Sequence, residues 1–518
     1  MSLLKKWFIW AVGAVLIAGG AFFLYPVPED GRQETAPPVS AAEGQKEPAA
    51  AAATPSNGVP EKHDGPGQQG GPSGPGEPLK KKKRKNTYGP GTWWYEEPVQ
   101  EEPQGPAPTD KDLVWIASDT HYVSPKMTDF GQAFRERLDR DDGKDLEDID
   151  RIMDRWIDEV LEERPGTVIL SGDLVMDGET VNHRELSEKL KRLQDDGITV
   201  LVIPGNHDIR VTMWSSSYHG DRMEPAETPM DRDAFLEIWH SFGYDQASAS
   251  DASSLSYLYK TDDRHWFLML DSAIYEPETL VEGRIKGETL LWMEEILKEA
   301  EQQHAQVIPV AHHNLLYESR LYRTMCTLNN WQEVTELLER YRVPVWFSGH
   351  LHLQRIRSYL PEPGAGPDQR ITEIVNGAFS MVPFPYGVLR LHDNGALEYE
   401  SRRVKVPEEV RQNGLDEFRR VIELQTASGI RGIPDYITGN MAESYARLLE
   451  RYVAGETVDA KAFREELGYR MMVKYIDPEQ SALPAKVHAI LEDTRREALS
   501  WSLPGEEEPE RPEDREKE

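Results

Sequence analysis

Five apolar runs in this chain end in polar residues of the same few kinds, and this pattern limits the possible folds more than any other feature. Residues 200–203 are mostly β-branched, as in a buried strand, and a Pro-Gly break then leads into Asn206, His207 and Asp208. Loops are polar and often contain His, so one such ending has a trivial explanation. Five endings in one chain instead favour a shared site at the carboxyl ends of the strands. The other four runs lead into Asp119 and His121, Gly172 and Asp173, His312 and His313, and Gly349, His350 and His352.

Between residues 112 and about 406, predicted strands alternate with predicted helices. The clearest helix is 146–163, whose apolar residues form one stripe, and further helices are predicted at 185–193, 287–301 and 331–341. Such alternation predicts a largely parallel core with helices outside. Two late runs, 371–379 and 386–399, with a turn at 393–395, predict a closing antiparallel hairpin. We therefore expect a layered α/β sandwich.

The polar residues at the strand ends have the chemistry of metal ligands. Oxygen and imidazole donors suit hard or borderline divalent ions rather than thiolate-seeking ones. Seven donors are too many for one ion that also binds substrate, but they suit two ions about 3.5–4 Å apart that share a carboxylate. Such a pair can hold a bridging hydroxide and clamp the oxygens of a phosphate ester. The seven candidates are Asp119, His121, Asp173, Asn206, His312, His350 and His352.

A metal-free enzyme would instead need a nucleophile with a base beside it. No Gly-x-Ser-x-Gly motif is evident, and Cys326, the one cysteine in the chain, has no catalytic motif around it. A single cysteine also excludes an internal disulfide and a cysteine-based zinc cluster. The metal-dependent interpretation is therefore favoured.

These motifs resemble the five motifs of the calcineurin-like metallophosphoesterases, in the order of that family and over residues 112–400. The resemblance implies a four-layer α/β/β/α sandwich with two metal ions, which could be Mn, Fe, Zn or Mg. It also implies that His207 donates a proton to the leaving oxygen, and that His312 rather than His313 is a ligand. By position, one ion would take Asp119, His121 and His352, the other would take Asn206, His312 and His350, and Asp173 would bridge them.

The subclass is predicted from finer features. Protein phosphatases of this superfamily continue the second motif as Gly-Asp-x-x-Asp-Arg-Gly, whereas here Asp177 comes one place later and no Arg follows. Several segments instead look similar to a secreted bacterial branch described as cyclic-nucleotide-phosphodiesterase-like, which carries a C-terminal helical domain. A phosphodiesterase is therefore favoured. A phosphomonoesterase or pyrophosphohydrolase, or a non-enzymatic surface-anchored binding module, are the alternatives. Candidate substrate contacts are Arg210, for which a plain surface role is favoured, His313 and Asn314.

The first thirty residues predict membrane targeting. Lys5 and Lys6 precede residues 7–25, which carry no charge and are long enough to cross a bilayer as a helix at about 1.5 Å per residue. The positive-inside rule places the rest of the chain outside the cytoplasmic membrane. We expect an uncleaved signal anchor at 1–30. Cleavage near Ala18 and Gly20, which would release a secreted protein, is the alternative.

The remaining segments are predicted from composition. Residues 31–108 are rich in Pro, Gly and Ala and form a disordered linker, whose basic run 80–85 favours contact with a polyanion such as a wall polymer or anionic lipid, or is simply a solvated charge block. The net charge of −32 argues against nucleic-acid binding. The catalytic domain is expected at 109–405, a helical domain at 406–503 with helices at 408–424, 436–452, 460–475 and 482–498, and a disordered acidic tail at 504–518.

Overall fold

The computed structural model describes residues 107–209, 215–225, 230–359 and 370–505. The predicted signal anchor, almost all of the linker with its basic run, Arg210 and most of the acidic tail lie outside these residues. Within the described ranges, no helix combines the length and the apolar character needed to cross a membrane.

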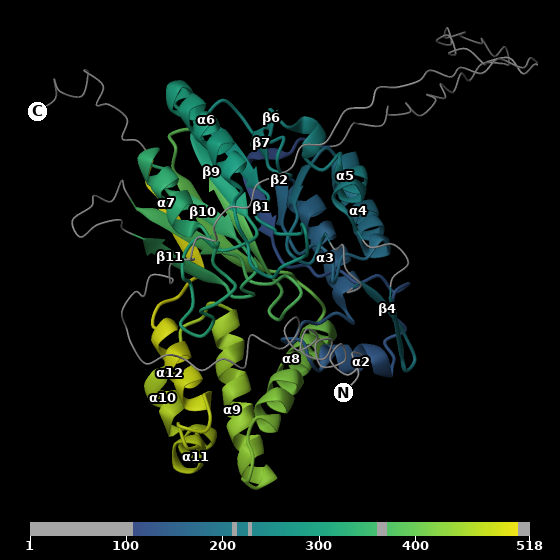
Figure 1. Ribbon diagram of the computed structural model, residues 1–518, viewed down its shortest axis with the longest axis vertical. Helices are drawn as coiled ribbons and strands as arrows, with labels where there is room; N and C mark the ends of the chain where they lie inside the picture. Colours follow the sequence, from purple (N-terminus) through teal and green to yellow (C-terminus); the bar gives the residue numbers. More distant parts are fainter. Residues whose placement is uncertain (1–106, 210–214, 226–229, 360–369, 506–518) are drawn as a thin grey trace, which may run out of the picture. The chain divides into compact units, whose positions relative to one another are not determined.

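Two β-sheets face each other at the centre of the catalytic domain (Figure 1). The first has six strands in the order β15-β14-β13-β1-β2-β3, in which β1, β2 and β3 are parallel and β13 to β15 are antiparallel additions. The first sheet therefore contains part of the predicted parallel core. The strands are β1 (Asp110–Ala117), β2 (Pro165–Ser171), β3 (Thr199–Ile203), β13 (Pro385–Leu391), β14 (Leu397–Arg403) and β15 (Ser500–Leu503).

The second sheet has seven strands in the order β11-β12-β10-β9-β8-β7-β6. Its central strands β8, β9, β10 and β12 are parallel, and antiparallel strands lie at both edges. A separate pair, β4 (Ser216–His219) and β5 (Arg222–Pro225), forms a small ribbon. The strands of the second sheet are β6 (Ala249–Ser250), β7 (Tyr257–Lys260), β8 (His265–Leu270), β9 (Gln306–Ala311), β10 (Val345–Ser348), β11 (Arg355–Tyr359) and β12 (Ile371–Val375).

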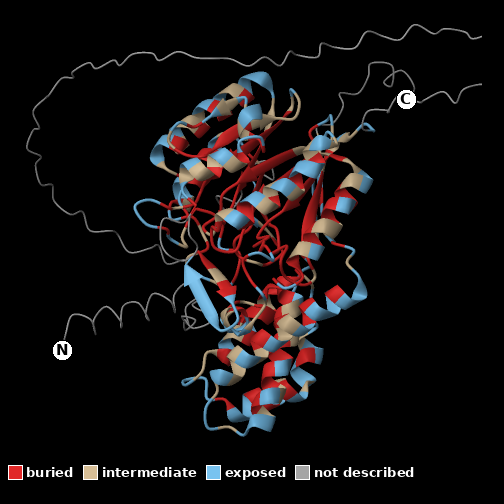
Figure 2. Ribbon diagram, turned by 90° about the vertical axis from the view of Figure 1, so that its right-hand side faces the viewer, coloured by how far each residue is buried: buried red, intermediate tan, exposed pale blue. Residues whose placement is uncertain are grey.

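The alternation of side chains along the strands produces the layers. In β1, Val114 and Ile116 enter the apolar cluster between the two sheets, whereas Trp115 and Ala117 enter the cluster under the helices on the outer face. Helices α3 (Ile149–Glu163), α4 (Thr180–Asp195) and α5 (Arg232–Trp239) contribute to that outer cluster, and α6 (Gly287–Gln303) and α7 (Trp331–Arg340) cover the second sheet. Figure 2 shows the buried residues concentrated in the sheets and on the inner helix faces. The result is a mixed α/β sandwich with helices on both outer faces.

The C-terminal part of the chain is helical, as expected. Its buried side chains belong to the same apolar cluster as α3 and α4, so it packs directly on the catalytic domain. The predicted helix 460–475 is divided in two at Glu466, and the last strand, β15, which was not predicted, joins β14 of the first sheet. The helices are α8 (Glu408–Ser428), α9 (Asp435–Val453), α10 (Ala460–Glu465), α11 (Leu467–Tyr475) and α12 (Leu483–Asp493), and two further short ones are α2 (Gln132–Leu138) and the 3-10 turn η2 (Tyr244–Gln246).

The predicted turn at 393–395 is confirmed, because it joins β13 and β14, but the predicted place of 371–379 in a closing hairpin is wrong. The first run forms β12, which lies inside the second sheet between β10 and β11. The hairpin is instead formed by β13 and β14 of the first sheet. The reason is burial on both faces: Ile371 packs under the outer helices and Ile374 packs between the sheets, as in an interior strand.

Candidate metal centre

The five motifs meet at the carboxyl ends of strands from both sheets. Asp119 and His121 follow β1, Asp173 follows β2, and Asn206 follows β3, all in the first sheet. His312 follows β9 in the second sheet, and His350 and His352 follow β10. Backbone hydrogen bonds hold the loops together: the Asp119 and His121 amides donate to the Gly172 and Asp173 carbonyls at 3.1 and 3.0 Å, and the Gly349 amide donates to the His312 carbonyl at 2.9 Å.

One group of donors is formed by Asp119, His121 and His352. Nε2 of His352 lies 3.1 Å from Nε2 of His121 and 3.2 Å from Oδ1 of Asp119. Together with Asp173, these side chains each offer a ligand atom within a small enough volume to hold a metal ion. Nε2 of His121 and Nε2 of His352 therefore face each other in a buried pocket. A cation shared by the two rings would account for that arrangement.

A second group of donors lies on the other side of Asp173. Nε2 of His312 is 3.2 Å from Oδ1 of Asn206, and its Nδ1 is 3.0 Å from the Ser171 carbonyl, which fixes the ring plane. Nε2 of His350 is 3.0 Å from the Met325 carbonyl, which orients this ring as well. His312, His313 and His350 form a second cluster that could hold a metal.

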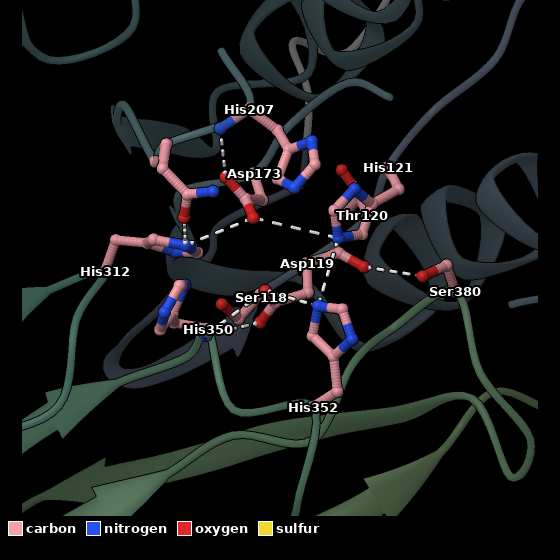
Figure 3. A network of polar contacts seen from close by, with 12 residues as sticks. Ser118, Asp119, Thr120, His121, Asp173, His207, His312, His350, His352 and Ser380 are labelled. Atoms are coloured by element: carbon pink, nitrogen blue, oxygen red, sulfur yellow. Dashed lines mark hydrogen bonds and ion pairs between the residues drawn. The ribbon is translucent and has the colours of Figure 1, made fainter. Parts of the chain in front are cut away.

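Asp173 lies between the two groups (Figure 3). Its Oδ2 is 3.2 Å from Nε2 of His312 and 3.8 Å from Nε2 of His121, and its Oδ1 accepts a hydrogen bond from the His207 amide at 2.7 Å. A single carboxylate oxygen therefore faces both groups, which is the position that a ligand shared by two ions requires.

Five of the seven predicted ligands have an unusual backbone. Asp119, His121, Asp173, His350 and His352 all have positive φ, between 42° and 65°. Residues other than glycine rarely adopt this conformation, and where it clusters it marks functional sites held by their surroundings. Here it turns each side chain toward the centre directly after its strand.

The glycines beside the ligands are required by close approach. A Cβ on Gly205 would lie 2.3 Å from Oδ1 of Asp173, and a Cβ on Gly349 would lie 1.8 Å from Oγ of Ser118. Neither distance is possible for a real side chain, so any other residue would push apart the loops that carry the ligands. The small residues seen in the sequence just before the polar groups therefore have a steric cause.

The electrostatics of the site favour positive charge beside Asp173. Burial raises the pKa of Asp173, but His312, His207 and His121 together outweigh it and hold the pKa well below its usual range. Burial lowers the pKa of His312, yet Asp173 beside it raises the pKa to about 9. Burial also lowers the pKa of His350 to about 4, which keeps that ring neutral and able to bind a metal.

His207 lies next to this centre but is held differently. Its Nδ1 is 2.7 Å from the Met176 carbonyl and 3.0 Å from Oδ1 of Asp177. Both acceptors face Nδ1, which fixes the plane of the His207 ring beside the centre. The sequence showed Asp177 only as a departure from the phosphatase motif, and its partnership with His207, 30 residues away, was not predicted.

The three predicted substrate contacts are placed as follows. Arg210 lies outside the described residues. His313 is buried, with its ring nitrogens 2.9 Å from Oγ of Ser272 and 3.0 Å from the Val281 carbonyl, and Asn314 donates to Oγ of Ser348 and to the Gly349 carbonyl, both at 3.0 Å. The choice of His312 rather than His313 as the ligand also stays a prediction, because both belong to the cluster that could hold a metal. Substrate binding by His313 and Asn314 stays a prediction.

The donor set fits a pair of hard or borderline divalent ions. It consists of carboxylate, amide and imidazole groups, with no thiolate among them. Burial raises the pKa of the Cys326 thiol to about 12, so that residue is neither a thiolate ligand nor a nucleophile. An α/β sandwich that gathers such donors at its strand ends belongs to the metal-dependent phosphoester hydrolases as a class.

Comparison with known proteins gives the family. Residues 113–354 match the family model of the calcineurin-like phosphoesterases, and this part of the chain is a calcineurin-like phosphoesterase domain. The resemblance found on the five motifs is thereby confirmed, whereas the similarity to a cyclic-nucleotide branch stays a prediction. No curated protein sequence matches the chain significantly.

Solved structures give more distant similarities. A dimetal phosphatase from Danio rerio is 12% identical over 56% of this chain and 96% of its own, with a TM-score of 0.40. The purple acid phosphatase PPD1 from yellow lupin seeds is 14% identical over 57% of this chain and 51% of its own, with a TM-score of 0.35. PhoD is 9% identical over 59% of this chain and 69% of its own, also with a TM-score of 0.35. Nothing about the activity of this chain follows from similarities this distant.

Proposed function

We propose that this protein is a metal-dependent phosphodiesterase, with cyclic nucleotides as the favoured substrate class, that acts outside the cytoplasmic membrane. The observation that carries the proposal is the position of Asp173, whose Oδ2 faces His312 at 3.2 Å and His121 at 3.8 Å. A carboxylate shared by two groups of metal-binding side chains is the central requirement of a two-ion phosphoesterase.

The ligands divide as the family motifs imply. Asp119, His121 and His352 would hold one ion, and Asn206, His312 and His350 would hold the other, with Asp173 shared. When bound, the two ions supply Lewis-acid activation of water and neutralise charge on the phosphate oxygens. The residues themselves fix where the ions bind, because the rings of His312, His350 and His352 are each oriented by a second contact to the protein.

His207 is the proposed proton donor. Asp177 and the Met176 carbonyl both face Nδ1, so this nitrogen is a donor and the ring is held in one orientation. Nε2 can then release a proton to the ester oxygen as the phosphorus–oxygen bond breaks, and the leaving group departs as a neutral alcohol.

A phosphodiester is favoured over a monoester by charge and by motif. A diester carries one negative charge and a monoester about two near neutral pH. The chain has a net charge of −32, so it repels the singly charged diester less than the doubly charged monoester. In the second motif, Asp177 stands where the protein phosphatases have an Arg, so the cation of that motif is missing here. Both features support a monoanionic substrate.

The location is proposed from the sequence alone. The uncharged segment 7–25 after Lys5 and Lys6 supports a single membrane anchor with the catalytic domain outside. On that basis the basic run 80–85 would lie near the membrane surface, where anionic lipids or wall polymers are its possible partners.

The test uses the full-length chain in mild detergent, stripped with chelator and reloaded with Mn²⁺. Hydrolysis of a 3′,5′-cyclic nucleotide and of bis(p-nitrophenyl) phosphate is compared with that of p-nitrophenyl phosphate, with Asp173→Ala as the matched control. Metal-dependent cleavage of diesters that the control lacks is the expected result. Turnover of the monoester alone would replace the proposal with a phosphomonoesterase. Binding of Mn²⁺ without turnover of any ester would favour a non-enzymatic module.

A further inference from the structure

A segment between α2 and α3 brings charged side chains up to the metal centre, although no motif includes it. Asp142, in this segment, accepts a short hydrogen bond from Nδ1 of His352. With Nδ1 as the donor to Asp142, Nε2 of His352 is the nitrogen that faces the other proposed ligands, 3.2 Å from Oδ1 of Asp119. Asp142 therefore sets the ring plane of a proposed ligand and holds its Nδ1 as a donor.

The same segment belongs to a row of alternating charges that ends at His207. Lys144 lies 2.8 Å from Asp142 and 2.5 Å from Asp141. Arg137 lies 3.1 Å from Asp141 and 3.5 Å from Asp177, the partner of His207. The side chains of Asp141 and Lys144 are 7% and 6% exposed, so these contacts are shielded from water and from screening by salt.

Helix α8 of the C-terminal domain holds this segment in place. Nε2 of Gln425 donates to the backbone carbonyls of Asp139 and Asp141, at 3.1 and 2.6 Å. Phe418 packs against Gly143, whose φ is +94° and where a Cβ would lie 2.8 Å from the ring. Asn413 donates to Asp148 at the end of the segment, at 2.8 Å. The backbone on both sides of Asp142 is therefore fixed by the helical domain.

Little space is left around the contact between Asp142 and His352. The cavity that they line with Phe418 of α8 and Leu449 of α9 measures about 20 Å³, which is room for about one water molecule. A water molecule in the space of a truncated side chain would carry no charge, so a change at Asp142 would leave the ring of His352 less firmly oriented.

We propose that Asp142 is a positioning residue of the metal centre and that α8 sets its position, so that the helical domain controls the affinity of one of the two ions. The proposal rests on the proposed function, because it assumes that His352 binds a metal. Carboxylates that orient a metal-binding histidine typically contribute 10–100-fold to metal affinity. Here the carboxylate is delivered by a segment that a second domain holds.

The experiment titrates the metal-stripped, full-length chain with Mn²⁺ and counts bound ions from the electron paramagnetic resonance of the free ion. We expect two ions on the wild-type chain. In Asp142→Ala one of them should bind about 10–100-fold more weakly and the other should be unchanged. Asp142→Asn keeps a hydrogen-bond acceptor but loses the charge. Its affinity for that ion should lie between those of the wild type and of Asp142→Ala. Asp139→Asn, in the same segment but pointing to the surface pair with Arg420, should bind as the wild type does.

The part played by α8 is tested with Gln425→Leu, which removes both hydrogen bonds at nearly constant volume. It should weaken the same ion several-fold, and its effect should largely disappear in the Asp142→Ala background. Arg411→Leu is the matched control, since its exposed ion pair with Glu408 lies within the same helix and does not reach the segment. Thermal unfolding of every variant separates loss of an ion from loss of the fold.

Three results would overturn the proposal in different ways. Two ions bound with wild-type affinity by Asp142→Ala would show that Asp142 does not position His352. Equal weakening of both ions, with a lowered melting temperature, would show a general structural effect. Wild-type Mn²⁺ affinity in Gln425→Leu would show that α8 does not set the position of Asp142. A wild-type chain that binds no Mn²⁺ would instead overturn the proposed function, and this inference with it.

Discussion

Oδ1 of Asp177 lies 3.0 Å from Nδ1 of His207, across 30 residues of sequence, and fixes the ring that stands beside the metal centre. Replacing His207 with Ala should lower kcat about 10²–10⁴-fold, because the leaving oxygen then departs unprotonated. The loss should be larger for an alkyl ester than for a p-nitrophenyl ester, whose leaving group hardly needs a proton. Steady-state rates on both esters provide the measurement.

Asp177→Asn should lower kcat less than His207→Ala, because the ring keeps its contact with the Met176 carbonyl and loses only one of the two acceptors that orient it. The number of bound metal ions should stay at two in both variants, as neither residue is a proposed ligand. Loss of an ion in either would place the residue in the metal-binding set instead.

The two groups of ligands should lose their ions separately. His121→Ala removes a donor from the group with Asp119 and His352, and His312→Ala removes one from the group with Asn206 and His350. Each variant should retain about one ion per chain, while Asp173→Ala, which affects both groups, should retain less. Metal analysis after gel filtration measures this directly. The same loss in all three variants would contradict two distinct sites.

Much of this site was predictable from the sequence, for a physical reason. A strand end carries its side chain to the edge of the sheet wherever the sheet lies, so Asp119, Asp173 and His312 could be assigned without knowing the strand order. The glycines at 205 and 349 were also visible in the sequence. They are needed because close approach between the loops leaves no room for a side chain.

Contacts between distant segments were not predictable. Asp142 is one of 91 acidic residues and stands in no motif, and only the folded chain brings it to His352. The pairing of β12 was predicted wrongly and β15 was not predicted, because the partner of a strand depends on the whole sheet. The positive φ of His350 and His352 also depends on the surroundings rather than on residue type.

Metal binding should stabilise the fold. The side chains of Asp119 and Asp173 are almost fully buried, so without a cation their charges are balanced only by neighbouring histidines. An ion present at 100 times its Kd stabilises the native state by about 2.7 kcal/mol per site, which corresponds to a shift of several degrees in Tm. Thermal scans across a series of Mn²⁺ concentrations, with Asp173→Ala as control, measure the effect. A Tm that does not change with Mn²⁺ would argue against a buried ion site.

Asp145, under helix α8, should destabilise the protein above neutral pH. Burial, followed by the nearby charge of Asp148, raises the pKa of Asp145 from its ordinary value of 3.8 to about 7. Between these values the native state keeps a proton that the unfolded chain has released, so stability falls as the pH rises and levels off above about 7. Asp145→Asn removes this cost. It should leave stability nearly unchanged at pH 4 and raise it by on the order of 3 kcal/mol at pH 8.

Urea unfolding of the wild type and of Asp145→Asn at pH 4, 6 and 8 checks this prediction. Glu136, exposed on α2, provides the control, because Glu136→Gln also removes one negative charge. A gain that is equal at all three pH values would mean that Asn improves packing or hydrogen bonding and that Asp145 is not the source of the pH dependence. A gain that grows with pH only in Asp145→Asn would tie that dependence to the buried carboxyl where α8 meets the catalytic domain.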